Sequence, residues 1–357
     1  MKTDRSGLLL FCSDGEFSVT GAQGAVSPTT ISIRQQSRYG SSNDTRVVEL
    51  NGELTYNTSN RKEIRTAVYS FSEDAYVSEN KTVFAHQMFQ RGKYPTGITK
   101  MRAMRDTQAQ LLFVTRQDGE MGVLTIDRKR NVQAWSRFTT QGLFRDCQAV
   151  ETDHGFTEGA IPTLYCIVER EIDGVTKTFI EALTEENVFL DHWYIGDNDT
   201  PKTNWGGLTT LPNTLVTVIG DGTVAGNFVV DSNGDFVLDK DYSDIQAGLA
   251  YPVVMETHPV TLTGETGVVR GNNIALKRAI VNLFDSLDMR INGRPLRFRQ
   301  FGPNLLDEPL VSESGQKEVR INNLQGTSRD PFVRVEVLQP VQSTLLTLDT
   351  EFIADTR

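Results

Sequence analysis

The sequence contains few cysteines: Cys12, Cys147 and Cys166 are the only ones in 357 residues, and none belongs to a Cys-x-x-Cys motif. An odd number of widely spaced cysteines argues against a disulfide framework. His154 and His192 have no second histidine or cysteine at ligand spacing, which argues against a zinc site. We therefore expect three reduced, buried and inert thiols.

Long hydrophobic runs are also absent. No stretch approaches the roughly 18 uninterrupted apolar residues that a membrane span requires. The apolar run at residues 8–12 is too short for a secretory signal and is typical of a strand. The sequence therefore predicts no membrane span, with synthesis and folding in a cytoplasm.

Catalytic motifs are missing as well. The glycines at positions 119 and 122 open no helix, and no Gly-Lys-Ser/Thr motif follows a glycine run, so no phosphate-binding loop is predicted. Hydrolysis of glycans requires paired carboxylates around a cleft. Glu169, Glu171 and Glu181 are close in sequence, but they flank a predicted hairpin and are expected to form its solvated face. We predict that the chain is not an enzyme and has no catalytic residue and no cofactor.

Two acidic segments resemble parts of a cation site. Residues 231–235 place oxygen ligands at alternate positions, as a calcium loop does, but Phe236 stands where glycine is needed and Tyr242 where a bidentate Glu belongs. A plain hairpin turn is expected there. Asp197 and Asp199 lie in a predicted loop, where we expect a solvated turn. No metal site is predicted.

Basic residues form two small groups, one at Lys100, Arg102 and Arg105 and one at residues 128–130. Neither has interleaved aromatic side chains, so we expect ordinary solvent-facing charge or a protein interface. The formal net charge of the chain is −10, and we expect the acidic residues to be spread over turns, without an acidic tail.

Short β-type runs that end in turns are the main content of the sequence. The clearest series is at residues 111–115, 122–126 and 132–138, where turn residues at 117–120 and a polar reversal at 127–131 connect three strands. Such a series is typical of a meander or a propeller blade.

Two more hairpins have the same pattern. Residues 8–12 turn at Asp14-Gly15 into residues 16–19, and residues 163–168 turn at Asp173-Gly174 into residues 177–181. Asp-Gly hairpins of similar size suggest a degenerate repeat.

One short helix is predicted at residues 79–89, with Ser78 as its N-cap and with Gly92 and Pro95 ending it. His86 on this helix is expected to be packed or solvated, and not a catalytic base. The apolar face of the helix is expected to consist of Val83, Phe84, Gln87 and Met88.

The second half of the chain is also predicted to be β. After a loop at residues 196–201, runs at 214–219, 227–230 and 236–238 with Gly-rich turns between them predict a small β-sandwich or barrel. Residues 274–289 would tolerate helix in part, but we favour a strand.

The end of the chain predicts a β platform that contacts neighbouring subunits. Residues 292–295 form a strong turn signal, and residues 332–337 alternate between apolar and charged, as in a half-exposed sheet. The predicted fold class is therefore all-β, with propeller-like blades at 1–190, the sandwich or barrel at 191–271 and the platform at 272–357.

Taken in order, these segments resemble the tail nozzle proteins of short-tailed bacteriophages, also called tail tubular protein B. The segments that carry the resemblance are residues 10–17, 28–40, 68–71 before Tyr76, the Trp135 strand, 181–183, the aromatic run 192–194 and a weaker echo at 331–352.

The resemblance implies a ring of six copies at the distal end of a phage tail, with a propeller outside and a channel for DNA. It also implies a virion protein assembled in the host cytoplasm, with phage adaptor or portal proteins, and tail fibres or a second nozzle chain, as partners. Known members of the family are usually longer, with an extra N-terminal half. Relative to those members, the strands that would complete the propeller are then either dispensable or supplied by another polypeptide.

The acidic balance has two interpretations. Duplex DNA carries one negative charge per roughly 1.7 Å of its axis, so an acidic channel wall would let it pass without holding it. Alternatively, the excess of acidic residues keeps the protein soluble. Two other functions also remain open: a carbohydrate-binding or carbohydrate-cleaving tail propeller, and a soluble scaffold unrelated to phage.

Overall fold

The computed structural model describes residues 2–4, 7–21, 26–89, 97–105, 110–127, 129–153, 160–183, 188–259, 262–264, 267–269, 274–298, 311–320 and 332–354. It is nearly all β, with 66% strand and 3% helix in several antiparallel sheets, which confirms the all-β part of the predicted fold class. The chain divides into two compact units, Met1–Glu185 and Glu186–Arg357, and each is described by itself.

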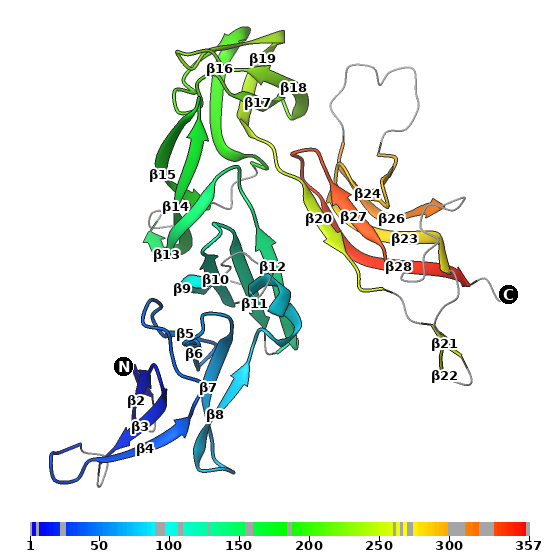
Figure 1. Cartoon of the computed structure of the whole chain (residues 1–357). Coiled ribbons are helices and arrows are strands. Elements are labelled where there is room, and N and C mark those ends of the chain that lie inside the picture. Colours follow the sequence, from blue (N-terminus) through cyan, green and yellow to red (C-terminus); the bar gives the residue numbers. More distant parts are fainter. Residues whose placement is uncertain are drawn as a thin grey trace. The chain divides into compact units, whose positions relative to one another are not determined.

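The described residues of the first unit form four sheets in chain order, and each is a meander whose sequential strands pair antiparallel (Figure 1). The first sheet consists of β1 (Lys2–Asp4), β2 (Gly7–Cys12), β3 (Gly15–Thr20) and β4 (Ser32–Ser37). The second consists of β5 (Val48–Leu50), β6 (Glu53–Asn57), β7 (Ile64–Ser70) and β8 (Ala75–Asn80). The third consists of β9 (Ile98–Arg105), β10 (Gln110–Arg116), β11 (Met121–Asp127) and β12 (Val132–Phe138), and the fourth of β13 (Leu143–Asp153), β14 (Ala160–Ile172) and β15 (Val175–Leu183).

Turn chemistry sets the register of these meanders, and the predicted hairpins are confirmed. Ile172 pairs with Val175, which leaves only Asp173 and Gly174 in the loop. Both loop residues have positive φ, 55° and 71°, as a type I′ turn requires. The turn before β11 uses Gly119 at φ 86°.

Apolar cores join consecutive sheets of the first unit, and β10 illustrates why. Leu112 and Val114 belong to the core shared with the second sheet, whereas Phe113 between them belongs to the core shared with the fourth. A third core joins Leu9 of the first sheet to Tyr56 of the second. Because both faces of the third sheet are covered, its central strand is continuously apolar and does not alternate.

The predicted helix at residues 79–89 is wrong in its first part. Residues 79 and 80 complete β8, and the described helical turns are η2 (Val83–Ala85) and α1 (His86–Phe89). Ser78 does not cap them, because its hydroxyl bonds Tyr56 and Arg65. Gly92 and Pro95 lie outside the described residues.

The predicted apolar face of this helix is wrong for Val83, Phe84 and Gln87, which are exposed, whereas Met88 is partly buried against the core. Phe84 and Val83 are 90% and 53% exposed, whereas Ala85 and Phe89 are buried. Phe89 lies one helical turn after Ala85 and contacts Trp135 with its ring edge, at a centroid distance of 5.1 Å. Contact with the third sheet, and not the local apolar spacing, determines which side is buried.

The second unit begins with one four-stranded sheet in the order β16-β19-β17-β18. Its strands are β16 (Asp191–Trp205), β17 (Leu215–Gly220), β18 (Thr223–Val229) and β19 (Phe236–Leu249). The loop predicted at residues 196–201 is part of β16, although the pairing with β19 is interrupted between Asp197 and Lys202. The turn between β17 and β18 is confirmed at Asp221 and Gly222, which have φ of 46° and 76°.

The rest of the second unit has two sheets that share one apolar core, which includes Val281, Ile291 and Val335. One sheet has the order β26-β23-β28, with β26 (Glu313–Arg320), β23 (Ile274–Ser286) and β28 (Thr344–Ala354). The other has the order β20-β27-β24-β25, with β20 (Val253–Glu256), β27 (Arg334–Val337), β24 (Arg290–Ile291) and β25 (Arg294–Pro295). A separate hairpin consists of β21 (Leu262–Gly264) and β22 (Gly267–Val269).

Three predictions for this region are confirmed. Residues 274–286 are a strand, and the turn at Asn292 and Gly293 has φ of 47° and 77°. Val333 and Val335 are buried, while Arg334 between them is only partly so, which is the expected alternation. The strand at residues 253–256 pairs with β27 and thus joins the C-terminal strands.

Candidate functional site

The three carboxylates considered for catalysis do not converge. Glu169 and Glu171 lie on one face of β14, and Glu181 of β15 is opposite Cys166, whose side chain is on the other face. Glu169 accepts a hydrogen bond of 2.7 Å from Arg145 Nε. The sheet therefore separates Glu181 from the other two carboxylates and gives no paired arrangement.

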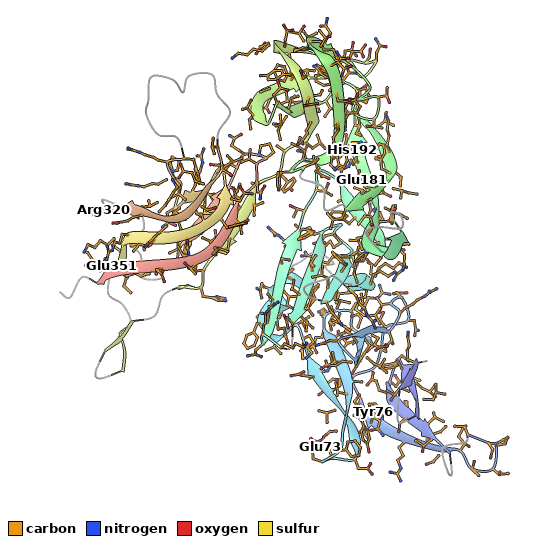
Figure 2. All side chains as sticks on the ribbon, turned by 180° about the vertical axis from the view of Figure 1, so that it is seen from behind. Glu73, Tyr76, Glu181, His192, Arg320 and Glu351 are labelled. Atoms are coloured by element: carbon orange, nitrogen blue, oxygen red, sulfur yellow. The ribbon has the colours of Figure 1, made fainter. Side chains whose placement is uncertain are left out.

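Glu181 instead neutralises a buried arginine. Arg170 is only 1% exposed, and its Nε and Nη2 atoms donate to the two carboxylate oxygens of Glu181, both at 2.7 Å. Its Nη1 atom donates to the Gln141 carbonyl at 3.1 Å. This bidentate pair fixes β14 against β15, and Figure 2 labels Glu181 on this sheet.

The calcium-like segment is a turn, but the expected hairpin is wrong, because it connects β18 to β19 and these two strands are not neighbours in the sheet. Asp231 Oδ1 accepts the backbone N–H groups of Asn233 and Asp235, at 2.7 and 2.9 Å. These bonds to the backbone lower the pKa of the Asp231 carboxyl below its ordinary value. Within the part of the chain that the structure describes, no group of three or more His, Cys, Asp or Glu could hold a metal ion.

The other cation and base candidates are separate from one another. Asp197 pairs with Asp244 across the β16–β19 ladder, and Asp199 is exposed two residues further on. His86 is exposed, with Nδ1 3.4 Å from the Val83 carbonyl oxygen.

His154 and His192 are the two histidines considered as zinc ligands. His192 Nε2 lies 2.9 Å from the Thr210 hydroxyl. His154 lies outside the described residues.

The basic groups do not form a continuous stripe. Arg102 of β9 donates to Gln148 at 2.8 Å and pairs with Asp146 at 3.5 Å, so it joins the third sheet to the fourth. Arg130 pairs with Asp127 inside its own turn, at 3.0 Å. Lys100 is partly buried, Arg105 and Lys129 are exposed, and Arg128 lies outside the described residues.

The expectation of three buried thiols is wrong for Cys12, which is exposed at the end of β2. Cys147 and Cys166 are buried and lie opposite each other in the β13–β14 ladder. Burial in the apolar core raises the pKa of Cys147 to about 12, which keeps this thiol protonated at neutral pH.

The acidic excess is concentrated, and not spread as expected. Residues 191–249 contain nine Asp and two Lys but no Glu or Arg, which gives this sheet a formal charge of −7 out of −10 for the chain. Eight of the nine Asp residues are exposed, and Asp191 is partly buried. A surface of this kind repels polyanions.

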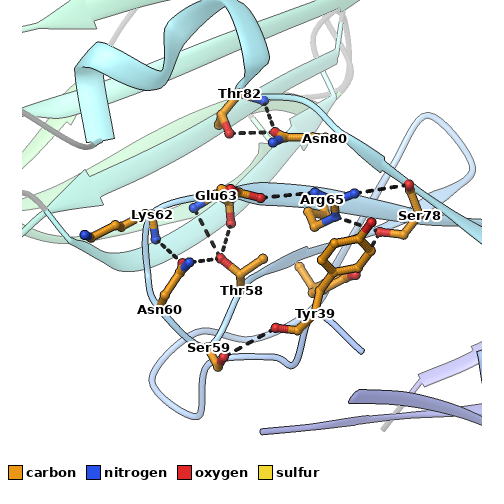
Figure 3. A network of polar contacts seen from close by, with 11 residues as sticks. Tyr39, Thr58, Ser59, Asn60, Lys62, Glu63, Arg65, Ser78, Asn80 and Thr82 are labelled. Atoms are coloured by element: carbon orange, nitrogen blue, oxygen red, sulfur yellow. Dashed lines mark hydrogen bonds and ion pairs between the residues drawn. The ribbon is translucent and has the colours of Figure 1, made fainter. Parts of the chain in front are cut away.

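A polar network holds the first sheet against the second (Figure 3). Arg65 of β7 is 8% exposed, and its guanidinium carbon lies 3.5 Å from the centroid of the Tyr39 ring. Its Nε atom donates to Ser78 at 3.0 Å, and its Nη1 atom pairs with Glu63 at 3.1 Å. The Ser59 hydroxyl donates to the Tyr39 carbonyl at 3.4 Å, which adds a second tie to the segment that follows β4.

Aromatic side chains gather where the β7–β8 hairpin reaches its tip. Tyr69 and Tyr76 are cross-strand partners with ring centroids 5.4 Å apart, and Phe71 contacts the edge of Tyr69 at 5.3 Å. Phe71 is 92% exposed, and the Tyr69 hydroxyl donates to Asp74 at 2.6 Å. Figure 2 shows Glu73 at this end of the hairpin. The tip thus offers an apolar ring beside carboxylates.

No helix in the described part of the chain is both long and apolar enough to cross a membrane. A scan of the sequence against protein-family models gave no match, and a search of curated proteins gave none either.

Proposed function

We propose that this chain is a structural component of the tail of a short-tailed phage, as the nozzle or an adjacent head-to-tail ring. Its work is mechanical: copies join in a cyclic oligomer, expected to be a hexamer, that retains the genome and then lets it leave. Adaptor or portal proteins, and tail fibres or a second nozzle chain, are the partners that this role requires. The protein would reside in the virion after assembly in the host cytoplasm.

One observation carries the proposal: the first unit is a series of consecutive antiparallel meanders that pack on each other in chain order. Sheets arranged this way are the building blocks of a propeller, which the nozzle resemblance implies. The segments that carry the resemblance before residue 190 fall largely on these meanders, including Trp135 on β12.

The charge distribution supports passage of DNA without capture. A wall rich in Lys and Arg would hold duplex DNA through counterion release, whereas Asp-rich surfaces disfavour contact. The sheet at residues 191–249 has no Arg and only two Lys. If it borders the channel, DNA slides past it.

The mass of the purified protein tests the proposal. We expect sedimentation velocity and negative-stain microscopy to show closed rings with a central opening, and we expect the same chain in tail fractions of purified virions. A protein that stays monomeric at high concentration and is missing from virions would contradict the proposal.

A carbohydrate-binding tail propeller is a second candidate because of the aromatic tip of the β7–β8 hairpin. Exposed aromatic rings beside carboxylates can stack on sugar rings and accept their hydroxyl hydrogen bonds, and Phe71 with Asp74 offers both groups. If this candidate holds, Phe71→Ala abolishes retention on immobilised host polysaccharide, while Phe84→Ala, at an equally exposed ring, does not. Absence of retention by the unmodified protein would reject it.

A further inference from the structure

The row of four sheets in the first unit has two outer faces, one on the first sheet and one on the fourth. Internal faces are covered because each sheet shares an apolar core with the next one. Among the described residues, neither outer face shares an apolar core with another sheet of the unit, yet both carry apolar side chains in cross-strand register.

The outer face of the first sheet follows from its pairing. Leu9 points into the core shared with the second sheet, so its neighbours Leu8 and Leu10 point away from it. Leu8 pairs with Val19, and Val19 pairs with Ile33. Leu10 pairs with Phe17, which completes an apolar face of five side chains. Val19 is covered, but Ile33 at the edge is 58% exposed.

The outer face of the fourth sheet is the reverse side of the one that holds Cys166. Ile167 and Ile180 are direct cross-strand partners and are 40% and 78% exposed. Tyr165 pairs with Ala182 next to them, and Val150 of β13 is 42% exposed. Burial of such exposed apolar area stabilises association, against the cost of ordering the two copies.

The charges near the two faces are complementary. Arg38, directly after β4, is exposed and makes no ion pair within the described residues, and its Nε atom donates to Gln35, which pairs with Phe17 of the outer face. Glu171 on β14 is exposed and also makes no ion pair there, while Glu169 lies two residues before it on the same face. Cations at one end and carboxylates at the other favour contact between unlike ends.

We propose that the outer face of the fourth sheet of one copy packs on the outer face of the first sheet of a second copy. The same kind of sheet-on-sheet contact that joins neighbouring sheets within the unit then continues from copy to copy. The contact is heterologous, because it joins two different patches, so it produces rings if the rotation closes and filaments if it does not.

This inference deepens the proposed function, because it names the contact on which a ring would rest. Two variants test it. Ile33→Asp places a charge on the first face, and Ile180→Asp places one on the fourth. Both side chains are more than half exposed, so each variant is expected to fold. Leu346→Asp, at a 57% exposed position of β28 in the other unit, is the matched control.

The decisive experiment measures the mass of each variant and of an equimolar mixture, by mass photometry and sedimentation velocity. Each variant alone should be monomeric, because every contact needs an intact outer face of the first sheet on one copy and an intact outer face of the fourth sheet on the other. The mixture should form dimers and nothing larger, through the fourth face of the Ile33→Asp copy and the first face of the Ile180→Asp copy. The Leu346→Asp protein should assemble like the unmodified protein, and circular dichroism should show unchanged folding of all three variants.

Other outcomes overturn the inference in different ways. If the unmodified protein forms rings and both variants still do, the ring role stands and this contact is wrong. If the variants are monomeric but their mixture yields no dimer, the contact does not join unlike faces. If the unmodified protein never assembles, both the contact and the proposed ring fail. Binding of another phage chain to the monomer at these faces would also reject a second copy as the occupant.

Discussion

Buried charge in the first unit is neutralised by side chains on neighbouring strands, and this is the main constraint at the scale of single residues. Arg170 is held by Glu181, and Arg65 is held by Glu63, Ser78 and the Tyr39 ring. Removing one partner of a buried ion pair leaves an uncompensated charge, which costs more than the net contribution of the pair itself. These residues stabilise the fold.

Glu181→Gln should therefore destabilise the first unit by about 3 kcal/mol, since Arg170 remains charged and buried. Urea unfolding followed by circular dichroism measures this change. Glu171→Gln, at an exposed carboxylate on the same sheet, should change the free energy of unfolding by less than about 0.5 kcal/mol. Equal effects of the two substitutions would show that the Arg170 pair is not needed.

A second prediction concerns pH. Glu16 is 2% exposed, and burial raises the pKa of its carboxyl, while the hydrogen bond from the Ser37 hydroxyl lowers it in part. A raised pKa means that the folded state binds the proton more tightly than the unfolded state. The stability from this group is therefore complete below about pH 4.5 and is lost as pH rises through the raised value.

Glu16→Gln does not ionise, so its free energy of unfolding relative to the unmodified protein should increase between pH 4 and pH 7. Glu318→Gln is the opposite-sign control, because the hydrogen bond from Arg320 lowers the pKa of Glu318. The effect should be small, since Glu318 lies at the surface. The free energy of unfolding of Glu318→Gln relative to the unmodified protein should decrease as pH rises toward neutral. A pH-independent difference for Glu16→Gln would contradict the assignment.

At the scale of secondary-structure elements, turns determine the architecture. Strands that end in Asp-Gly turns could be predicted from sequence, because few residues adopt positive φ readily, and these turns were placed correctly. The helix at residues 79–89 was misplaced because pairing with β7 overrides a helical pattern, and this pairing is not visible locally. Glu181 lies on the other face of the sheet from Glu169 and Glu171 because of the strand register, which the sequence does not disclose.

Two features of the candidate sites could have been found from sequence alone. Arg170 follows Leu164, Cys166 and Val168 at steps of two, so the alternation of a strand places its side chain on the same buried face. A buried cation needs a partner of opposite charge. The Asp-rich composition of residues 191–249 is likewise readable by counting. The exposure of Cys12 could not be predicted, because it depends on where the end of β2 lies in the folded unit.

Gly40 provides a test at this scale, because it lies where the first sheet meets the second. It has φ of 69°, and a Cβ atom there would lie 1.9 Å from the Ser13 carbonyl oxygen. Gly40→Ala should therefore destabilise the unit by more than about 3 kcal/mol or prevent its folding. Gly52 has a similar φ of 76° with no atom within 4 Å of that position, so Gly52→Ala should cost only about 1 kcal/mol. Thermal unfolding compares the two variants, and equal costs would refute steric contact as the cause.

At the scale of the whole molecule, three features stand out: the stacked meanders of the first unit, its two apolar outer sheet faces, and the acidic sheet at residues 191–249. In the proposed hollow assembly, the sheets would form walls, the faces would form contacts between copies, and the Asp-rich surfaces would not retain DNA. The proposed function then depends on how copies fit together.

The central claim is that copies of this chain close into a hollow ring, and a cryo-electron microscopy reconstruction of the assembled protein tests it most directly. The account predicts a closed cyclic oligomer, expected to have six subunits, with an axial channel wide enough for duplex DNA. A monomer or a solid particle without an axial opening would contradict it.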